Sequence, residues 1–281
     1  MKNLGAILLA AITLGVFYFV VYGEGIGKET EQGNPIELDS NIKSLNLRLE
    51  SSDTTIIPVE QDFIEVKIDG KGALYVKGNK KELIIEVRRK WYERFGLNAK
   101  SNVTVNVPKD FQEKLSVSIG SGNLTFDGGR MELEELSLNL SSGDMELDNI
   151  TAKTLKHNGS SGDLHAKKVI TKEAELNISS GDVRLEDFEG ALSGDVSSGE
   201  LKVTISQLLG DIDLDVSSGD VQLTLPDNAD FTLNGKYSSG NIASNKILKF
   251  EDSENGVIKG VSGTGKYEIK LSVSSGSVHL N

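Results

Sequence analysis

Ser179-Ser180-Gly181-Asp182 is the stretch that decides the fold, because it returns along the chain at an almost constant spacing. Identical copies begin at Ser141, Ser160 and Ser217, and looser copies keep the glycine but change one or two flanking residues. The glycines of this Ser-Ser-Gly motif are nearly evenly spaced except for the last, and they are Gly122, Gly143, Gly162, Gly181, Gly199, Gly219, Gly240 and Gly276. A sustained period of about 20 residues indicates a repeat architecture.

The residues around each motif predict strands. Apolar residues alternate with polar ones on both sides of Ser179, and they are Ala174, Leu176, Ile178, Val183 and Leu185. Such alternation is typical of a strand with one buried face. The motif between the strands is turn chemistry, because Gly permits positive φ and Ser and Asp side chains bond nearby backbone groups.

Two short strands cannot bury their inner faces alone, whereas stacked coils can. The sequence therefore predicts an all-β fold, a parallel β-solenoid with rungs about 4.8 Å apart. An antiparallel β-sandwich or prism is the alternative.

Composition excludes several classes of function. The 281 residues carry a formal charge of −12, which argues against nucleic-acid binding and against broad adsorption to anionic lipid. The chain has no cysteine, which excludes a small disulfide scaffold and a thiolate metal site.

Residues 1–23 are expected to be a signal anchor with one transmembrane helix. The run from Leu4 to Tyr22 contains no charged residue and is long enough to cross a bilayer. Lys2 should stay inside, so that the acidic body lies outside the cell membrane. A cleaved secretory signal is the alternative, although Val21-Tyr22-Gly23 matches the usual cleavage site poorly.

Three regions are expected after the anchor. Residues 24–35 are polar and lack periodicity, as in a linker. Residues 36–110 contain less regular strand-like segments, an irregular β region that could cap the solenoid. Residues 111–281 contain the repeats, with an irregular insertion from Asn245 to Gly265, and the chain ends in a final strand.

One stretch breaks the strand pattern and contrasts with the acidic chain. It contains the only Trp and four basic residues, and the residues that could contact a partner are Arg88, Arg89, Lys90, Trp91, Tyr92, Arg94 and Phe95. The structural interpretation is a packed Trp with Arg stems along a strand end. The functional interpretation is a contact loop for a glycan, an anionic wall polymer, a lipid headgroup or a protein.

Stacking of the motifs would align five carboxylates along one edge, those of Asp144, Asp163, Asp182, Glu200 and Asp220. Like charges about 4.8 Å apart repel by about 1 kcal/mol in water. Each carboxylate should therefore accept hydrogen bonds from the amides of its own turn, or a cation such as calcium should bridge the rungs. The first arrangement is the expected one, because the calcium-binding Gly-Gly-x-Gly-x-Asp motif does not occur.

No catalytic residue, metal or cofactor is predicted. The repeated serines lie in turns, without a Gly-x-Ser-x-Gly elbow or a repeating His. Gly260 to Lys266 nearly matches a phosphate-binding loop, but Tyr267 stands where Ser or Thr should hold magnesium. His157 falls in the inward register and is expected to be a hydrogen-bonded interior residue, whereas His165 and His279 face outward.

The anchor, the β-rich body and the serial Ser-Ser-Gly motifs resemble the bacterial "putative adhesin" β-repeat family. The arrangement is especially similar to LiaG-type membrane-anchored proteins, which belong to cell-envelope stress systems of Gram-positive bacteria. The resemblance covers roughly residues 36–281 as a repeat pattern, and it implies an extracytoplasmic solenoid-like domain with no assigned reaction. It transfers no functional residue to this chain.

The leading hypothesis is a non-enzymatic envelope protein, held in the membrane by its N-terminal helix, that binds an envelope protein or a wall polymer. The alternative is a carbohydrate-active enzyme on a β-helix scaffold that acts on wall or extracellular polysaccharide. Such enzymes need paired carboxylates and often aromatic platforms, and only 6% of these residues are aromatic. A spacer without a binding partner is the third hypothesis.

Overall fold

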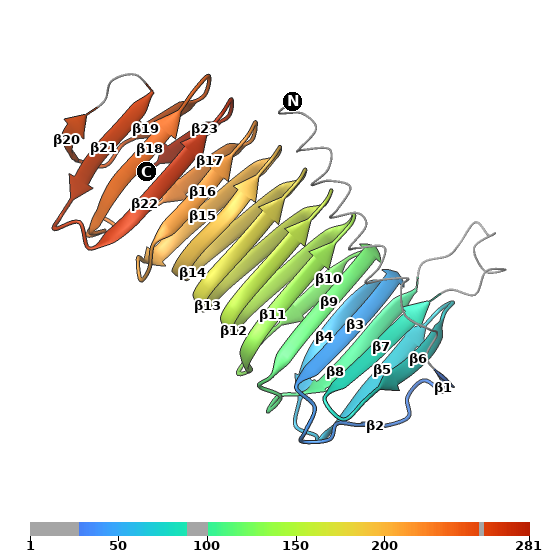
Figure 1. Cartoon of the computed structure of the whole chain (residues 1–281). Helices are drawn as coiled ribbons and strands as arrows, with labels where there is room; N and C mark the ends of the chain where they lie inside the picture. Colours follow the sequence, from blue (N-terminus) through green and yellow to red (C-terminus); the bar gives the residue numbers. More distant parts are fainter. Residues whose placement is uncertain (1–27, 89–100, 253–255) are drawn as a thin grey trace.

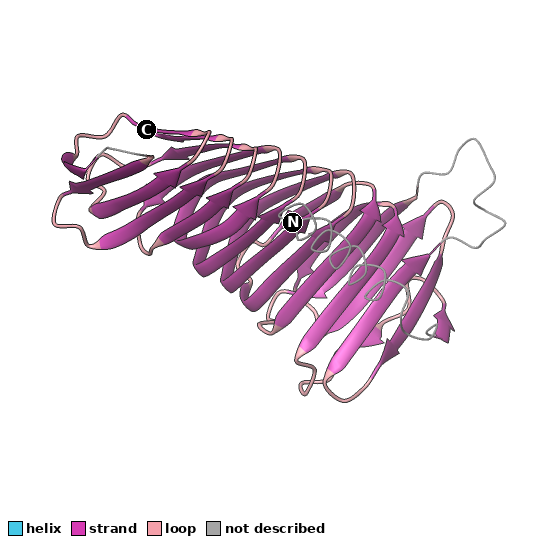
Figure 2. Ribbon diagram, turned by 45° about the horizontal axis from the view of Figure 1, so that its top comes forward, coloured by secondary structure: helices cyan, strands magenta, loops and turns pink. Residues whose placement is uncertain are grey.

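The computed structural model describes residues 28–88, 101–252 and 256–281, and the regular elements in them are β-strands (Figures 1 and 2). This confirms the predicted all-β class. Successive repeats pair in parallel, as β12 (Asp144–Gly159) does with β13 (Asp163–Ile178). The repeat region therefore winds in stacked coils rather than in an antiparallel sandwich. The described residues contain no helix that could span a bilayer, and the expected anchor lies outside them.

Each central coil has two long sides and one short side. In the coil that starts at Asp144, the first long side ends at Asp148 and the chain bends at Asn149, whose φ is +52°. Lys168 and Asp187 make the same bend in the next two coils, with φ values of +52° and +53°. The short side follows and contains residues 151–153 of this coil. The second long side then leads back to the Ser-Ser-Gly corner.

The long sides form two sheets with one strand per coil. The first sheet contains the strands that lead into the corner, which in spatial order are β7 (Glu82–Arg88), β3 (Ser44–Ser51), β9 (Lys114–Ser121), β11 (Glu132–Leu140), the second halves of β12, β13 and β14 (Asp182–Val196), β16 (Ile212–Val216), β22 (Tyr267–Val273) and β18 (Phe231–Tyr237).

The second sheet contains the strands that leave the corner, which in spatial order are β8 (Asn102–Pro108), β4 (Asp53–Val59), β10 (Leu124–Asp127), the first halves of β12, β13 and β14, β15 (Glu200–Gln207), β17 (Asp220–Thr224), β23 (Ser277–Leu280) and β19 (Asn241–Ser244).

The order of the coils in space departs from their order in sequence at both ends. β3 lies between β7 and β9, so the first coil in the sequence is the second in space. At the other end β22 lies between β16 and β18. The final strand of the chain was predicted, and its coil is enclosed between two others.

Antiparallel strands extend the sheets beyond the last coils. At the N-terminal end, β6 (Ala73–Gly78) and β1 (Lys28–Thr30) extend the first sheet, while β5 (Phe63–Asp69) and β2 (Ile36–Glu37) extend the second. At the C-terminal end, β21 (Val257–Ser262) and β20 (Lys249–Asp252) extend the first sheet. The stretch expected to be a linker therefore includes a paired strand, β1, and the insertion expected to be irregular forms most of this cap.

The glycines of the motif allow the backbones of neighbouring coils to touch. A Cβ atom on Gly162 would lie 2.2 Å from the Gly143 carbonyl oxygen, and one on Gly181 would lie 2.4 Å from the Gly162 carbonyl oxygen. All eight motif glycines have such a contact below 3.0 Å, and only four of them have positive φ: Gly122, Gly143, Gly181 and Gly199. The close approach of neighbouring coils therefore requires glycine in all eight motifs, and a positive φ favours it in four of them.

The core consists of apolar columns, one residue per coil. One column consists of apolar residues that are at most 1% exposed, and they are Leu136, Leu155, Ala174, Leu192, Ile212 and Ile269. In the next column His157 stands between Leu138 and Leu176. It is fully buried, and neither ring nitrogen has a hydrogen-bond partner among the described residues. The inward register was predicted correctly, but the expectation of a hydrogen-bonded histidine is wrong.

We expect His157→Leu to stabilise the protein and to reduce its sensitivity to acid. Burial lowers the pKa of His157 from 6.5 to about 4, so the unfolded chain takes up a proton at a higher pH than the folded chain. The histidine therefore reduces the free energy of unfolding as the pH falls from about 6.5 to about 4, by on the order of 3 kcal/mol. Leucine occupies the same position in both neighbouring coils and does not titrate. Urea unfolding at neutral pH and near pH 4 measures the difference.

His279→Leu is the control, because His279 is exposed. The same pH dependence of unfolding in the wild type and in His157→Leu would contradict the assignment.

Two glycine substitutions distinguish the cost of close approach from the cost of backbone strain. They are Gly162→Ala and Gly129→Ala. Gly162 has a carbonyl oxygen in the space of a Cβ but lacks positive φ, whereas Gly129 has a φ of +58° and nothing within 4 Å. We expect Gly162→Ala to cost at least about 3 kcal/mol, because it forces two coils apart. Gly129→Ala should cost about 1 kcal/mol. Denaturant unfolding of both variants gives the comparison, and equal costs would mean that φ alone explains the glycines.

Deletion of residues 267–281 should unfold more of the chain than it removes. It takes β22 and β23 from between two coils, so β18 and β19 lose the strands that connect them to the rest of the array. Hydrogen exchange measured by mass spectrometry should show lost protection across residues 231–262, with residues 144–178 still protected. Retained protection of β18 in the deletion variant would refute this account of the C-terminal end.

Candidate functional site

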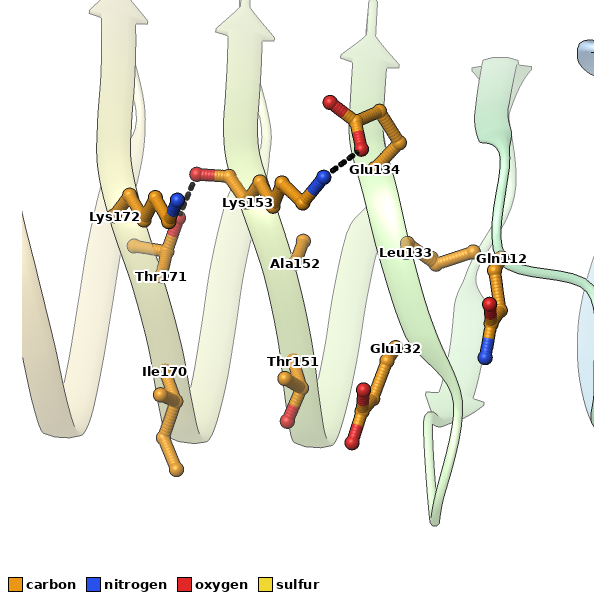
Figure 3. Close-up of a pocket in the computed structure, with 10 residues that line it drawn as sticks. All are labelled: Gln112, Glu132, Leu133, Glu134, Thr151, Ala152, Lys153, Ile170, Thr171 and Lys172. Atoms are coloured by element: carbon orange, nitrogen blue, oxygen red, sulfur yellow. Dashed lines mark hydrogen bonds and ion pairs between the residues drawn. The ribbon is translucent and has the colours of Figure 1, made fainter.

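A trough crosses three coils on the short side of the solenoid (Figure 3). Its volume is about 340 Å³, and its side chains form three rows that run across β11, β12 and β13. Each row has one residue per coil. The floor is Leu133, Ala152 and Thr171, one wall is Glu132, Thr151 and Ile170, and the other wall is Glu134, Lys153 and Lys172.

The register of the coils creates this trough. Leu133, Ala152 and Thr171 are only 3 to 8% exposed, and the side chains of the last two are small. The walls beside them point outward, so Ile170 is 49% exposed although its neighbour Val169 is fully buried. The trough ends after β13 because β14 is one residue shorter here, which shifts the register between Ile170 and Glu173.

The two lysines of the second wall differ in their partners. Lys153 forms an ion pair with Glu134, and its ammonium group lowers the pKa of that carboxyl. Lys172 is exposed and makes no ion pair within 4.0 Å in the described part of the chain. An unpaired ammonium group beside an apolar floor can bind an anionic group that is carried next to an apolar one.

A second depression lies on the outer face of the second sheet. Two hollows of about 430 and 530 Å³ share Thr125 and Asp127, and together they extend from the β8 coil to the β13 coil. Near one end, Glu186 forms an ion pair with Arg184 at 2.9 Å and accepts a hydrogen bond from His165 at 3.2 Å. The other end contains the exposed Arg130, so this groove also offers a cationic group to a ligand.

The contact residues predicted from the sequence are only partly described. Arg88 ends β7, and its guanidinium group lies 2.5 Å from Glu86 and 5.7 Å from the centroid of the Tyr75 ring. Arg88 is thus packed at the end of its strand. The others, Arg89, Lys90, Trp91, Tyr92, Arg94 and Phe95, lie outside the described residues.

The predicted column of carboxylates forms, but its hydrogen bonds differ from the expectation. Asp163 accepts a hydrogen bond from the backbone N–H of Asp182 at 2.9 Å, and Asp182 accepts one from the N–H of Glu200 at 3.1 Å. Each of these carboxylates thus binds the next coil rather than its own turn. The described residues include no group of three His, Cys, Asp or Glu side chains arranged to hold a metal ion.

The stretch that resembles a phosphate-binding loop already binds an anion of the protein itself. Asp230 accepts hydrogen bonds from the backbone N–H groups of Thr264, Gly265 and Lys266 at 2.6 to 3.0 Å. The bond from Lys266 foremost, then one from the Thr264 hydroxyl and those from the other two amides, lower the pKa of Asp230 to about 2. The turn is therefore a structural joint between β21 and β22.

The trough could not be predicted from local sequence, because each of its rows takes one residue from each of three repeats. The one local signal is Ile170, an apolar residue in an outward register. Its significance depends on Ala152, which lies on β12 and becomes its neighbour only when coils stack.

Comparison with known proteins defines the family. Residues 42–281 match the family described as Toastrack DUF4097. No curated protein matches the chain.

Solved structures match the chain at low sequence identity. A "putative adhesin" from Bacteroides fragilis is 9% identical with a TM-score of 0.49, over 90% of this chain and 97% of that one. One from Parabacteroides distasonis is 14% identical with a TM-score of 0.43, over 91% and 98%. A "putative lipid binding protein" from the same organism is 14% identical with a TM-score of 0.38, over 90% and 98%. The family match covers nearly all of the coiled body, and the chain therefore belongs to the Toastrack DUF4097 family.

Proposed function

We propose that this protein is a non-enzymatic binding module of the bacterial cell envelope, and that the trough on its short side is the binding site. The observation that carries the proposal is the unpaired Lys172 beside an apolar floor and the exposed Ile170. A ligand with an anionic group next to an apolar part would satisfy both. The rigid stack of coils holds the three rows in fixed positions, so little conformational entropy is lost on binding.

The location outside the membrane is also a proposal, and it rests on the uncharged segment from Leu4 to Tyr22. In this arrangement the acidic body faces the wall, and an anionic wall polymer or an envelope protein is within reach of the trough. A role in the cell-envelope stress response rests on the resemblance to LiaG-type proteins.

Lys172→Glu tests the trough as the binding site. Sedimentation of the full-length protein with purified Gram-positive cell wall should show binding that falls at least about tenfold in this variant, because the change replaces an attractive charge with a repulsive one. Ile170→Ser should also weaken binding, through loss of apolar contact.

Lys236→Glu is the matched control, since it makes the same change of charge on an exposed residue in another coil. Equal binding by the Lys172 and Lys236 variants would rule out the trough. Release of sugar products from the wall by the wild type would favour the carbohydrate-active enzyme instead.

Photocrosslinking in intact cells can identify the partner. A crosslinker at position 170 should capture it, and one at position 91 tests the contact stretch predicted from the sequence. A discrete protein adduct indicates an interaction module, and a polymer adduct indicates wall binding.

A further inference from the structure

The two ends of the solenoid are capped unequally. At the N-terminal end each sheet is extended by two antiparallel strands beyond the last coil, β6 and β1 in the first sheet and β5 and β2 in the second. At the C-terminal end β21 and β20 extend the first sheet beyond β18 (Figure 1). The second sheet stops at β19, which pairs with β23 and with no further strand in the described part of the chain.

The free edge of β19 presents backbone groups in a defined pattern. The N–H groups of Asn241 and Asn245 point toward β23, where they donate to the carbonyl oxygens of Gly276 and Leu280 at 3.1 and 2.8 Å. Because N–H and C=O groups alternate along a strand, those of Ile242 and Ser244 point away from β23. Four hydrogen-bonding groups therefore face the position that a further strand would occupy.

Apolar side chains border the same position. β21 extends the first sheet by one strand, so its inner face lies across from the place where the second sheet has none. Ile258 on β21 is only partly buried, and Leu248 covers the neighbouring Gly260. Ile247, which follows shortly after β19, is 96% exposed. A strand added to β19 would gain both backbone hydrogen bonds and apolar contact.

We propose that β19 is a docking edge for an extended polypeptide segment of a partner protein, which adds as the next strand of the second sheet. Strand addition to an open edge is a general mode of peptide recognition. The site is distinct from the trough and does not depend on the function proposed there.

A second copy of the chain fits this edge less well. Two β19 strands could pair antiparallel only with both cores on the same side of the joined sheet, which would bring β21 of one copy to the position of β18 in the other. A single strand avoids this collision, because it needs only the space across from β21.

Hydrogen exchange on the full-length chain tests whether the edge is free. The amides of Ile242 and Ser244 should exchange rapidly, while those of Asn241 and Asn245 are protected. Protection of Ile242 and Ser244 at low protein concentration would mean that the chain itself fills the edge. Protection that increases with protein concentration would assign the edge to a second copy. Either result overturns the proposal.

A peptide of residues 216–226 is a suitable probe for binding. It contains β17, which pairs with β23 in the same register as β19 does. Fluorescence anisotropy of the labelled peptide with the full-length protein should show saturable binding. Hydrogen exchange of the complex should show protection of the Ile242 and Ser244 amides. A scrambled peptide should not bind. Absence of binding to a protein with rapidly exchanging edge amides overturns the proposal.

Ser244→Pro and Ser244→Ala form a matched pair. Proline removes the outward N–H, whereas alanine keeps it, and both remove the hydroxyl that accepts a hydrogen bond from Lys246 N–H at 3.2 Å. We expect Ser244→Pro to weaken peptide binding at least about tenfold, and Ser244→Ala to leave it within about twofold. Equal effects of the two variants, with unchanged thermal unfolding, would show that the backbone edge is not the docking site.

Discussion

The contact between backbones at the Ser-Ser-Gly corner is the constraint on which the rest of the structure depends. A carbonyl oxygen of one coil occupies the space where the next coil would need a Cβ, from Gly122 through to Gly240. This close approach sets the spacing and the register of both sheets at once. The apolar columns, the line of carboxylates and the trough all follow, because each is one position repeated in neighbouring coils.

Neighbouring coils also satisfy each other's polar groups. The carboxylates of Asp163 and Asp182 would repel along the edge of the stack, but each accepts a backbone hydrogen bond from the next coil. Asp230 is used in the same way, because it accepts hydrogen bonds from the amides of the turn before β22. Side chains whose charges are used in this way support the fold, whereas Lys172 makes no ion pair within 4.0 Å in the described part of the chain.

The ends of the array differ from its middle in how the chain is threaded. Near both ends a coil inserts between two others, and antiparallel strands cover most of the exposed edges. An open parallel sheet edge can pair with further strands, so such caps prevent uncontrolled association. At β19 the second sheet has no such antiparallel strand in the described part of the chain. The trough lies elsewhere, on the short side of the central coils. The solenoid thus offers two separate surfaces with different chemistry.

The sequence by itself determined the features that depend on local spacing. The all-β class, the coil period, the inward register of His157 and the alignment of the motif carboxylates all follow from alternation and from the even spacing of the Ser-Ser-Gly motifs. Only the tertiary structure decided which coils are neighbours, because any parallel strand of the right length can occupy an open edge. It therefore placed β22 between β16 and β18, brought Lys172 beside Ala152, and left His157 without a hydrogen-bond partner among the described residues. These features depend on contacts between residues of different coils, which no local pattern specifies.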